Sequence, residues 1–448
     1  MKKTGIVAMV VMMACLVMCG CASKRGKVGF GENGQERSTL TGTEGLPDLM
    51  ERLELSDYLA YAALNNPGLK AAFEHWRAAI EEVPQAKSLP DPKITYGNFI
   101  REVETKVGPQ HQKFGIMQSF PWFGTLKART ELAGAKAKAA MKQYQAVKLK
   151  LFWQVKASFA EYAYLAEAIR ITRENLQLLQ HFEEVARSKY IVSIGTHPDL
   201  LHAQIQLANM ENVLETLEAF REPVVARLNA ALNRPPTAHL AWPERGEFRE
   251  VRFDISDVMA LLIAKNPELG SLEWEIEAAK KKIELAKKRF YPDIGTGIEW
   301  IRSGGKDPMI LLFSMVLPLW RESYKAGERQ AQAEMREVTY QKLDIQNTIL
   351  AKAVEVLYDY EEAVREIHLY ADTLIPKAEE LVRTSEIAYK VGTMDFLSLI
   401  ESQQMLLRYQ LGYERALADH QQKLAELEML AGGELGEAAS SEEEKENN

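Results

Sequence analysis

The stretch SDYLAYAALNNP, residues 56–67, recurs as SDVMALLIAKNP at residues 256–267. Three further pairs follow at nearly the same spacing: Pro90-Asp91 with Pro292-Asp293, Phe120-Pro121-Trp122 with Leu317-Pro318-Leu319, and Gly195-Thr196 with Gly392-Thr393. A period of about 200 residues is far longer than the roughly 20 to 50 residues of solenoid repeats. The sequence therefore predicts two copies of one architectural unit.

The first residues have the pattern of a lipoprotein signal peptide. Lys2 and Lys3 precede an apolar stretch, residues 5–17, which is shorter than the about 20 residues of a membrane-spanning helix. Residues 18–21, MCGC, resemble a bacterial lipobox with Cys21 as the acylated residue, and Ala22 after it implies the outer membrane. Cleavage would leave Cys21 as the only cysteine, so we expect neither a disulfide framework nor a thiolate metal site.

Composition excludes some classes of protein. The formal net charge is -8, and an acidic chain lacks the basic face that binding of nucleic acid requires. Beyond residue 21 no segment approaches the about 20 apolar residues of a spanning helix, because the longest candidate, residues 309–320, contains Pro318. If the chain crosses a membrane, it must do so with strands.

Turn residues and composition divide the chain into segments. We predict a signal peptide over 1–20, a lipidated flexible tether over 21–48, a first repeat over 49–232, an inter-repeat linker over 233–254, a second repeat over 255–432 and a disordered acidic tail over 433–448. Each repeat should contain a helix, a β-hairpin, a long helix, a tip and a further helix. Ser56 and Ser256 are expected as N-caps, and Pro67 and Pro267 as kinks or breaks.

Two very long helices are predicted. Residues 126–192 contain no proline and are dominated by good helix formers, which corresponds to about 100 Å of helix. The second copy covers residues 323–390, with a bend at Pro376. Helices of this length must pack against one another along their length.

Each long helix ends at a repeated glycine–threonine pair, which predicts a helical-hairpin tip. Gly195 and Gly392 are expected in the left-handed conformation that ends a helix. Thr196 and Thr393 are expected to cap the next helix, with Asp199 and Asp395 in its first turn. These two acids are therefore either capping residues or, in an oligomer, rings of charge at a gate.

Four strands are predicted between the short and the long helices, at residues 93–101, 113–120, 294–301 and 309–317. Four strands leave open edges, and open edges cannot face lipid. Several chains must therefore close one barrel. Two chains would give eight strands, which enclose only side chains, so an open lumen requires more.

The duplicated plan, together with the motifs FPWFG at 120–124, YPD at 291–293, LPLW at 317–320 and YKVGT at 389–393, resembles the TolC-like outer-membrane efflux channels. This resemblance implies a mainly α chain with four strands, assembled as a homotrimer whose 12-stranded membrane β-barrel continues into a periplasmic α-helical barrel. It also implies a periplasmic adaptor (membrane fusion protein) and an inner-membrane pump of the RND type as partners. The motif PWFG is most similar to the lipoprotein branch that exports heavy-metal cations.

The resemblance assigns roles to residues at the two ends of the helices. The tips that meet the adaptor are Ile194, Gly195, Thr196, Val391, Gly392 and Thr393. The junctions between barrel and helices are Pro121, Trp122, Gly124, Pro318 and Trp320. The protein is expected to be lipid-anchored through Cys21 and to extend from the outer membrane into the periplasm.

Other functions find little support in the sequence. The chain lacks the motifs GxxxxGK, GxSxG and HExxH, so neither an enzyme nor a cofactor is expected. His197 and His202 are five residues apart and do not share a helical face, so no metal site is expected. The alternative is a non-conducting periplasmic coiled-coil lipoprotein scaffold or adaptor, but only a pore needs strand hairpins. We expect a channel of this kind to export heavy-metal cations, or otherwise drugs or other small molecules.

Overall fold

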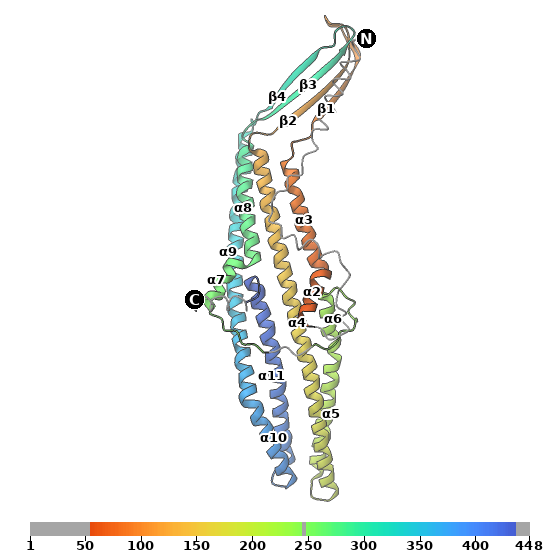
Figure 1. The fold of residues 1–448 in the computed structure, drawn as a ribbon, viewed down its shortest axis with the longest axis vertical. Coiled ribbons are helices and arrows are strands. Elements are labelled where there is room, and N and C mark those ends of the chain that lie inside the picture. Colours follow the sequence, from red (N-terminus) through yellow and green to blue (C-terminus); the bar gives the residue numbers. More distant parts are fainter. Residues whose placement is uncertain (1–53, 244–247, 436–448) are drawn as a thin grey trace, which may run out of the picture. The chain divides into compact units, whose positions relative to one another are not determined.

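The computed structural model describes residues 54–243 and 248–435, all within one compact unit, residues 47–448. Two series of elements follow one another in the same order (Figure 1). The first is α2 (Leu55–Asn65), α3 (Pro67–Lys87), β1 (Lys93–Val103), β2 (Gln110–Phe120), α4 (Thr125–Ile191), α5 (His197–Ala219) and α6 (Arg221–Ala231). The second is α7 (Ile255–Lys265), α8 (Pro267–Lys288), β3 (Asp293–Ser303), β4 (Met309–Val316), α9 (Arg321–Leu369), the π-helix η1 (Tyr370–Leu374), α10 (Ile375–Lys390) and α11 (Phe396–Ala431).

The predicted fold class, mainly α with four strands in two hairpins and a duplicated long-helix unit, is confirmed. The strands lie within one to three residues of their predicted bounds. The signal peptide, the tether and residues 436–448 of the acidic tail lie outside the described residues, as does Cys21.

An asparagine–proline pair ends one helix and begins the next in both series. The side-chain oxygen of Asn66 accepts a hydrogen bond from the Leu69 N–H at 3.0 Å. Pro67 occupies the first position of α3, where a backbone N–H would have no acceptor within the helix, so its missing N–H costs nothing. Asn266 accepts from the Leu269 N–H at 3.1 Å at the start of α8. The predicted breaks at both prolines are therefore confirmed.

The same two asparagines hold the last helix of each series in place. Asn66 Nδ2 donates to the carbonyl of Ala231 at the end of α6, and Asn266 Nδ2 donates to the carbonyl of Leu430 near the end of α11, both at 2.9 Å. The break between α2 and α3 is therefore tied to the end of α6, and the break between α7 and α8 is tied to the end of α11.

The N-caps of α2 and α7 lie two residues before the predicted serines. Glu54 caps α2 and forms a capping box with Asp57, and Asp254 caps α7 by accepting a hydrogen bond from the Ser256 N–H at 2.7 Å. A carboxylate at the N-cap also interacts favourably with the positive end of the helix dipole, so it replaces the serine that the sequence motif suggested.

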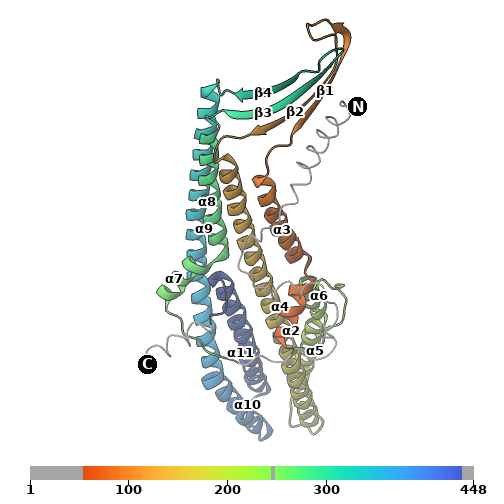
Figure 2. The same ribbon diagram turned by 45° about the horizontal axis from the view of Figure 1, so that its top comes forward.

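The long helices differ between the two series. α4 is continuous over 67 residues, whereas its counterpart is interrupted by η1 just before Pro376. Proline cannot donate the helical hydrogen bond, so the regular α-helical pattern is interrupted before Pro376, where we predicted a bend, and the interruption takes the form of a π-helix. Figures 1 and 2 show α3 and α8 flanking the half of α4 nearer the sheet, and α5 and α11 flanking the other half.

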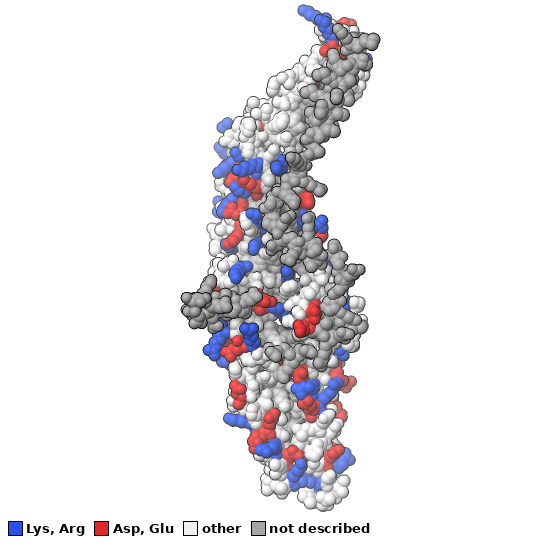
Figure 3. All heavy atoms as spheres, viewed as in Figure 1, with Lys and Arg blue, Asp and Glu red and all other residues white. Residues whose placement is uncertain are grey.

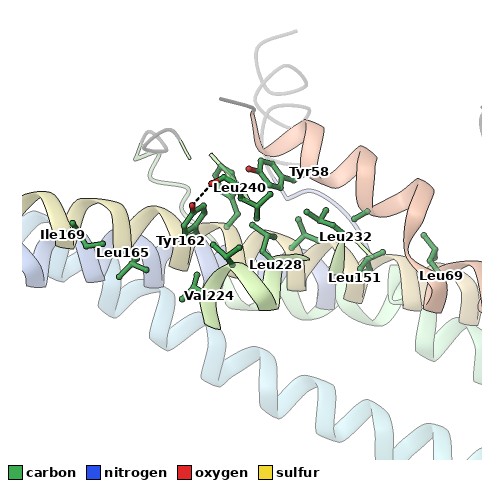
Figure 4. Packing of buried hydrophobic residues seen from close by; sticks show 14 residues of the cluster. Tyr58, Leu69, Leu151, Tyr162, Leu165, Ile169, Val224, Leu228, Leu232 and Leu240 are labelled. Atoms are coloured by element: carbon green, nitrogen blue, oxygen red, sulfur yellow. Dashed lines mark hydrogen bonds between the residues drawn. The ribbon is translucent and has the colours of Figure 1, made fainter. Parts of the chain in front are cut away.

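Buried clusters occur where the short helices meet the long ones. Figure 4 shows the first, in which Tyr58 from α2 and Leu228 from α6 pack with Tyr162 of α4. The Tyr162 hydroxyl donates to the carbonyl of Leu240 at 3.1 Å. A matching cluster surrounds Tyr360 of α9, whose hydroxyl donates to the carbonyl of Val251 at 2.9 Å. Both tyrosines thus hold the segment that connects the two series.

The four strands form one antiparallel sheet in the order β1-β2-β3-β4, with β1 and β4 as its edges. Directly paired residues have their side chains on the same face. Two rows of paired residues cross all four strands and are almost entirely aliphatic or aromatic: Ile94, Ile116, Ile298 and Leu311, followed by Tyr96, Phe114, Trp300 and Met309. We call this side of the sheet the apolar face. The residues of its first row are between 47% and 72% exposed, so the protomer leaves this face uncovered.

The alternate rows belong to the opposite side of the sheet, which we call the glycine-rich face. They are Lys93, Met117, Gly297 and Leu312, followed by Thr95, Gly115, Glu299 and Ile310. Lys113 forms an ion pair with Glu299 at 3.3 Å on this face. Figure 3 shows few charged atoms over the strands, whereas charged side chains are spread over the helices. Within the described ranges, no helix has both the length and the apolar character of a membrane span.

Candidate functional site at the tips and junctions

The first tip joins α4 to α5. Ser193, with φ of 62°, takes the left-handed position after the helix, and the N–H groups of Ile194 and Gly195 both donate to the carbonyl of Lys189 at 2.9 Å. The prediction that Gly195 is left-handed is therefore wrong. A Cβ at Gly195 would lie 2.8 Å from the Lys189 Cβ, so glycine is needed there for the close return of the chain.

Thr196 caps α5 as predicted. Its hydroxyl accepts a hydrogen bond from the Asp199 N–H at 3.3 Å, and the Asp199 carboxylate accepts one from the Thr196 N–H at 3.4 Å. These two bonds form a capping box, so the structure assigns Asp199 a local role at the helix start.

The second tip joins α10 to α11 in a different way. Gly392 has φ of 82° and is left-handed as predicted, following Val391 at the end of α10. Thr393 is not the cap of the next helix, because its N–H and its hydroxyl both donate to the carbonyl of Ala388. Asp395 is the N-cap instead and accepts from the Ser398 N–H at 2.8 Å. Both connections have five residues, 192–196 and 391–395, but the glycine–threonine pair lies two residues earlier in the second. The last residue of the connection, which caps the next helix, is therefore a threonine at the first tip and an aspartate at the second.

Hydrogen bonds to Ser398 hold the pKa of Asp395 below its usual range. The carboxylate is therefore ionised, and it remains exposed to solvent. Asp199 at the other tip is only partly exposed. The structure thus shows both acids as capping residues, and a charged ring at a gate remains a prediction.

The tips present an uncovered apolar surface. Ile191, Ile194 and Val391 are between 69% and 75% exposed, and the ends of both hairpins are largely free of charged atoms in Figure 3. Exposed large aliphatic side chains in one place are typical of a surface that a partner covers.

A lysine connects the two tips within the chain. Lys189 Nζ at the end of α4 donates to the carbonyl of Tyr389 at the end of α10 and lies 4.0 Å from the centre of its ring. Burial raises the pKa of Tyr389 to about 12, and the nearby charge of Asp199 acts in the same direction. Sequence analysis missed this contact, because a lysine in the last turn of a helix is expected simply to interact with the helix dipole.

The junctions between strands and helices lie at the other end of these helices. Asp293, at the start of β3, accepts a hydrogen bond from the Trp122 N–H at 3.0 Å, and the Trp122 ring stacks on Tyr291 at 5.1 Å. Gly124, with φ of 80°, is the N-cap of α4, and Pro121 precedes the turn. These contacts join the β2–α4 junction to the α8–β3 junction.

The junction between β4 and α9 has no counterpart of the hydrogen bond from Trp122 to Asp293 among the described residues. Pro318 and Trp320 link β4 to α9. Within the described parts of the chain, the Leu319 N–H donates only to the carbonyl of Leu317, two residues earlier. Trp320 and Phe123 are 79% and 78% exposed, so each junction presents an uncovered aromatic side chain. Exposed aromatic residues are typical of the boundary between lipid and water.

No group of three or more His, Cys, Asp and Glu side chains in the described parts of the chain has the arrangement of a metal site. His197 and His202 lie in α5, and the ring of His197 packs against Tyr190. The arrangement at the tips and junctions therefore consists of turns, caps and exposed apolar surfaces.

Comparison with known proteins agrees with this architecture. The family model for outer membrane efflux proteins matches residues 59–234 and 258–433. The pyoverdine export outer membrane protein OpmQ of Pseudomonas putida is 23% identical over 333 residues, covering 70% of this chain and 68% of that protein. Nodulation protein T of Rhizobium leguminosarum bv. trifolii is 20% identical and covers 84% of this chain and 85% of its own.

Solved structures share the fold. The outer-membrane channel OprN superimposes with a TM-score of 0.74 at 16% identity, covering 85% of this chain and 90% of its own. VceC of Vibrio cholerae gives a TM-score of 0.72 at 17% identity, covering 85% and 96%. Since the family model spans both series of elements and most of the described residues, this chain belongs to the outer membrane efflux protein family.

Proposed function

We propose that this protein is the outer-membrane channel of a tripartite efflux system. Three copies would close the open edges β1 and β4 into a barrel of 12 strands, and the long helices would continue it as a periplasmic α-helical barrel. The observation that carries this proposal is the two-sided sheet, because an apolar face outside and a glycine-rich, charged face inside are what a water-filled barrel in lipid requires. Cys21 would add a lipid anchor at the outer membrane.

The orientation of the chain follows from the same surfaces. The exposed Phe123 and Trp320 would lie at the boundary between lipid and periplasm, next to the strands. The two tips would then be the parts farthest from the membrane. Their exposed aliphatic residues suit the periplasmic adaptor, which would connect the channel to an inner-membrane pump of the RND type.

The channel would conduct passively what the pump delivers, and it would carry out no chemistry. The motif Pro121-Trp122-Phe123-Gly124 favours heavy-metal cations. The names of relatives refer instead to export of pyoverdine, to toxin and drug export and to fusaric acid resistance, which favours a wider range of small molecules. The alternative function, a non-conducting scaffold or adaptor, gives no role to a sheet with one apolar face.

Planar-bilayer recording with the purified, full-length protein tests the proposal. We expect stable conductance steps from a trimer. A strain that lacks the gene should regain export on complementation, and a panel of copper, silver, fusaric acid and common drugs would identify the cargo. A trimer that inserts and never conducts would contradict the channel and favour the scaffold.

A further inference from the structure

The duplication within one chain provides a template for the contact between chains. Inside the chain, β2 of the first series pairs with β3 of the second, and α4 packs against α8. The elements at the two sides of this arrangement are α3 and β1, which pack against α4 and β2, and α9 and β4, which pack against α8 and β3. Among the described residues, the outer side of each has no partner element. Since α3 is the counterpart of α8 and α9 is the counterpart of α4, a second copy can present α3 and β1 to α9 and β4 in the same arrangement.

Shared contacts fix which residues correspond. Asn66 and Asn266 make the same two kinds of hydrogen bond, which pairs each residue of α3 with the residue of α8 200 positions later. Tyr162 and Tyr360 both hold the connecting segment through their hydroxyls, which pairs each residue of this part of α4 with the residue of α9 198 positions later.

An ion pair of the template recurs with its charges exchanged. Lys281 of α8 forms an ion pair with Glu131 of α4 at 2.9 Å. The counterparts of these residues are Glu81 on α3 and Arg329 on α9. Both counterparts are exposed, and neither side chain forms an ion pair with any residue in the described part of the chain. The positive residue of α8 is replaced by a negative one on α3, and the negative residue of α4 is replaced by a positive one on α9. The two counterparts therefore still have opposite charges, as expected if they meet across an interface between two chains.

The packing of α3 supports the same arrangement. Ser271 and Ala278 of α8 are buried, and the Ser271 hydroxyl donates to a carbonyl of α4, that of Ala139, at 3.2 Å. Their counterparts on α3 are Ala71 and Ala78, which are exposed in the protomer. Small residues allow two helices to approach closely, and on α3 no other described element covers these two alanines.

The second strand-to-helix junction lacks an aspartate that the first one has. Asp293 accepts the Trp122 N–H, and the repeated motifs make Asp91 the counterpart of Asp293 and Leu319 the counterpart of Trp122. Asp91 is exposed and has no hydrogen-bond partner among the described residues. The Leu319 N–H makes only the contact to Leu317, in the weak geometry of a γ-turn.

We propose that a second copy of this chain completes both places: Glu81 of one subunit pairs with Arg329 of the next, and Asp91 accepts the Leu319 N–H of that next subunit. The motifs that make Asp91 the counterpart of Asp293 and Leu319 the counterpart of Trp122 also make Tyr96 the counterpart of Ile298 and Phe313 the counterpart of Ile116. Because Ile116 and Ile298 are directly paired within the chain, Phe313 of β4 should be directly paired with Tyr96 of β1 in the neighbouring subunit. Phe313 and Tyr96 both belong to the apolar face, so the register keeps the faces continuous. This inference rests on the proposed assembly of several chains and adds its contacts.

Charge exchange in the full-length protein tests the ion pair. Arg329→Glu alone and Glu81→Arg alone should each reduce the ratio of trimer to monomer several-fold in mild denaturant, measured by native mass spectrometry. The double variant should restore the ratio, since the two charges are again opposite. Glu82→Arg with Arg329→Glu is the control, because Glu82 is exposed on the same helix one position away. Equal rescue by the control would overturn the assignment.

Disulfide formation tests the register separately. Directly opposed residues of antiparallel strands have Cα atoms about 4.5 to 5.5 Å apart, which suits a disulfide. Tyr96→Cys with Phe313→Cys should give covalently closed trimers on oxidation, whereas Tyr96→Cys with Leu311→Cys should not. Trimers without this disulfide and without charge rescue would overturn the inference and leave the proposed channel standing. A protein that never forms trimers would overturn both.

Discussion

Adjacent leucines in β4 give opposite predictions for the same substitution. Leu311 is paired with Ile298, the middle residue of β3, and belongs to the apolar face, whereas Leu312 is paired with Gly297 on the glycine-rich face. Arginine on the lipid face near the middle of a membrane costs about 2 to 4 kcal/mol. At about 1.4 kcal/mol for each factor of ten, Leu311→Arg should lower the ratio of folded to unfolded protein roughly 30-fold to 700-fold. Leu312→Arg should have a much smaller effect.

Folding into lipid vesicles, followed by urea titration, measures this difference directly. The two variants have the same composition and the same loss of a leucine, so each is the control for the other. Leu311→Thr controls for the loss of the aliphatic side chain, because threonine keeps the preference for strands. Equal stability of the two arginine variants, or a greater loss in Leu312→Arg, would refute the assignment of the apolar face to lipid.

Four other outcomes are expected. Labelled palmitate should enter the wild-type protein and not Cys21→Ser, and equal labelling would exclude Cys21 as the acylated residue. Burial lowers the pKa of His420 from 6.5 to about 4, so the unfolded state binds the proton more readily, and the free energy of unfolding should fall by up to about 3 kcal/mol between pH 6.5 and pH 4. His420→Gln should flatten that dependence in thermal melts, and an unchanged slope would count against it. Asp395→Asn should keep the helix cap and the melting temperature but weaken cation preference in bilayer recordings, and unaltered selectivity would leave only the capping role. Lys189→Met should increase the open probability, and an unchanged conductance record would show that its contact with Tyr389 does not restrain the tip.

Sequence patterns predicted the elements because each one carries its own signal. The repeated asparagine–proline pairs fixed the helix breaks, since the missing N–H of Pro67 and of Pro267 acts locally. The four strands were found within a few residues, because strand length and flanking turns are also local properties. Because of the duplication, each element has a signal at two places in the sequence, which supports its assignment more strongly than one motif does.

The details of the caps and turns could not be predicted in the same way. Two neighbouring residues often have similar capping ability, so Asp254 could replace Ser256, and Asp395 could replace Thr393, at little cost. At the first tip, Ser193 adopts the left-handed conformation that was expected of Gly195. Such choices depend on how closely the chain returns over the end of the helix, which is a property of the packed structure.

Contacts between distant residues were also beyond the sequence. The two sides of the sheet could be assigned only from the pairing register, because β4 is apolar at almost every position. The contact of Lys189 with Tyr389 joins residues 200 positions apart. The face of the sheet that meets lipid and the link between the tips therefore came from the structure.

The tips differ from the rest of the duplication in one respect that bears on opening. The bonds that end α4 and α10 make Ser188 the counterpart of Ile387, so Lys189 corresponds to Ala388 and Tyr190 to Tyr389. Within a chain, Lys189 therefore reaches Tyr389, but in the equivalent place between chains an alanine would face Tyr190. Alanine has no charge and no side-chain donor, so this bond cannot form there. If the lysine contact restrains the tips, the two hairpins of one chain should move together, and the tips should separate first between neighbouring chains.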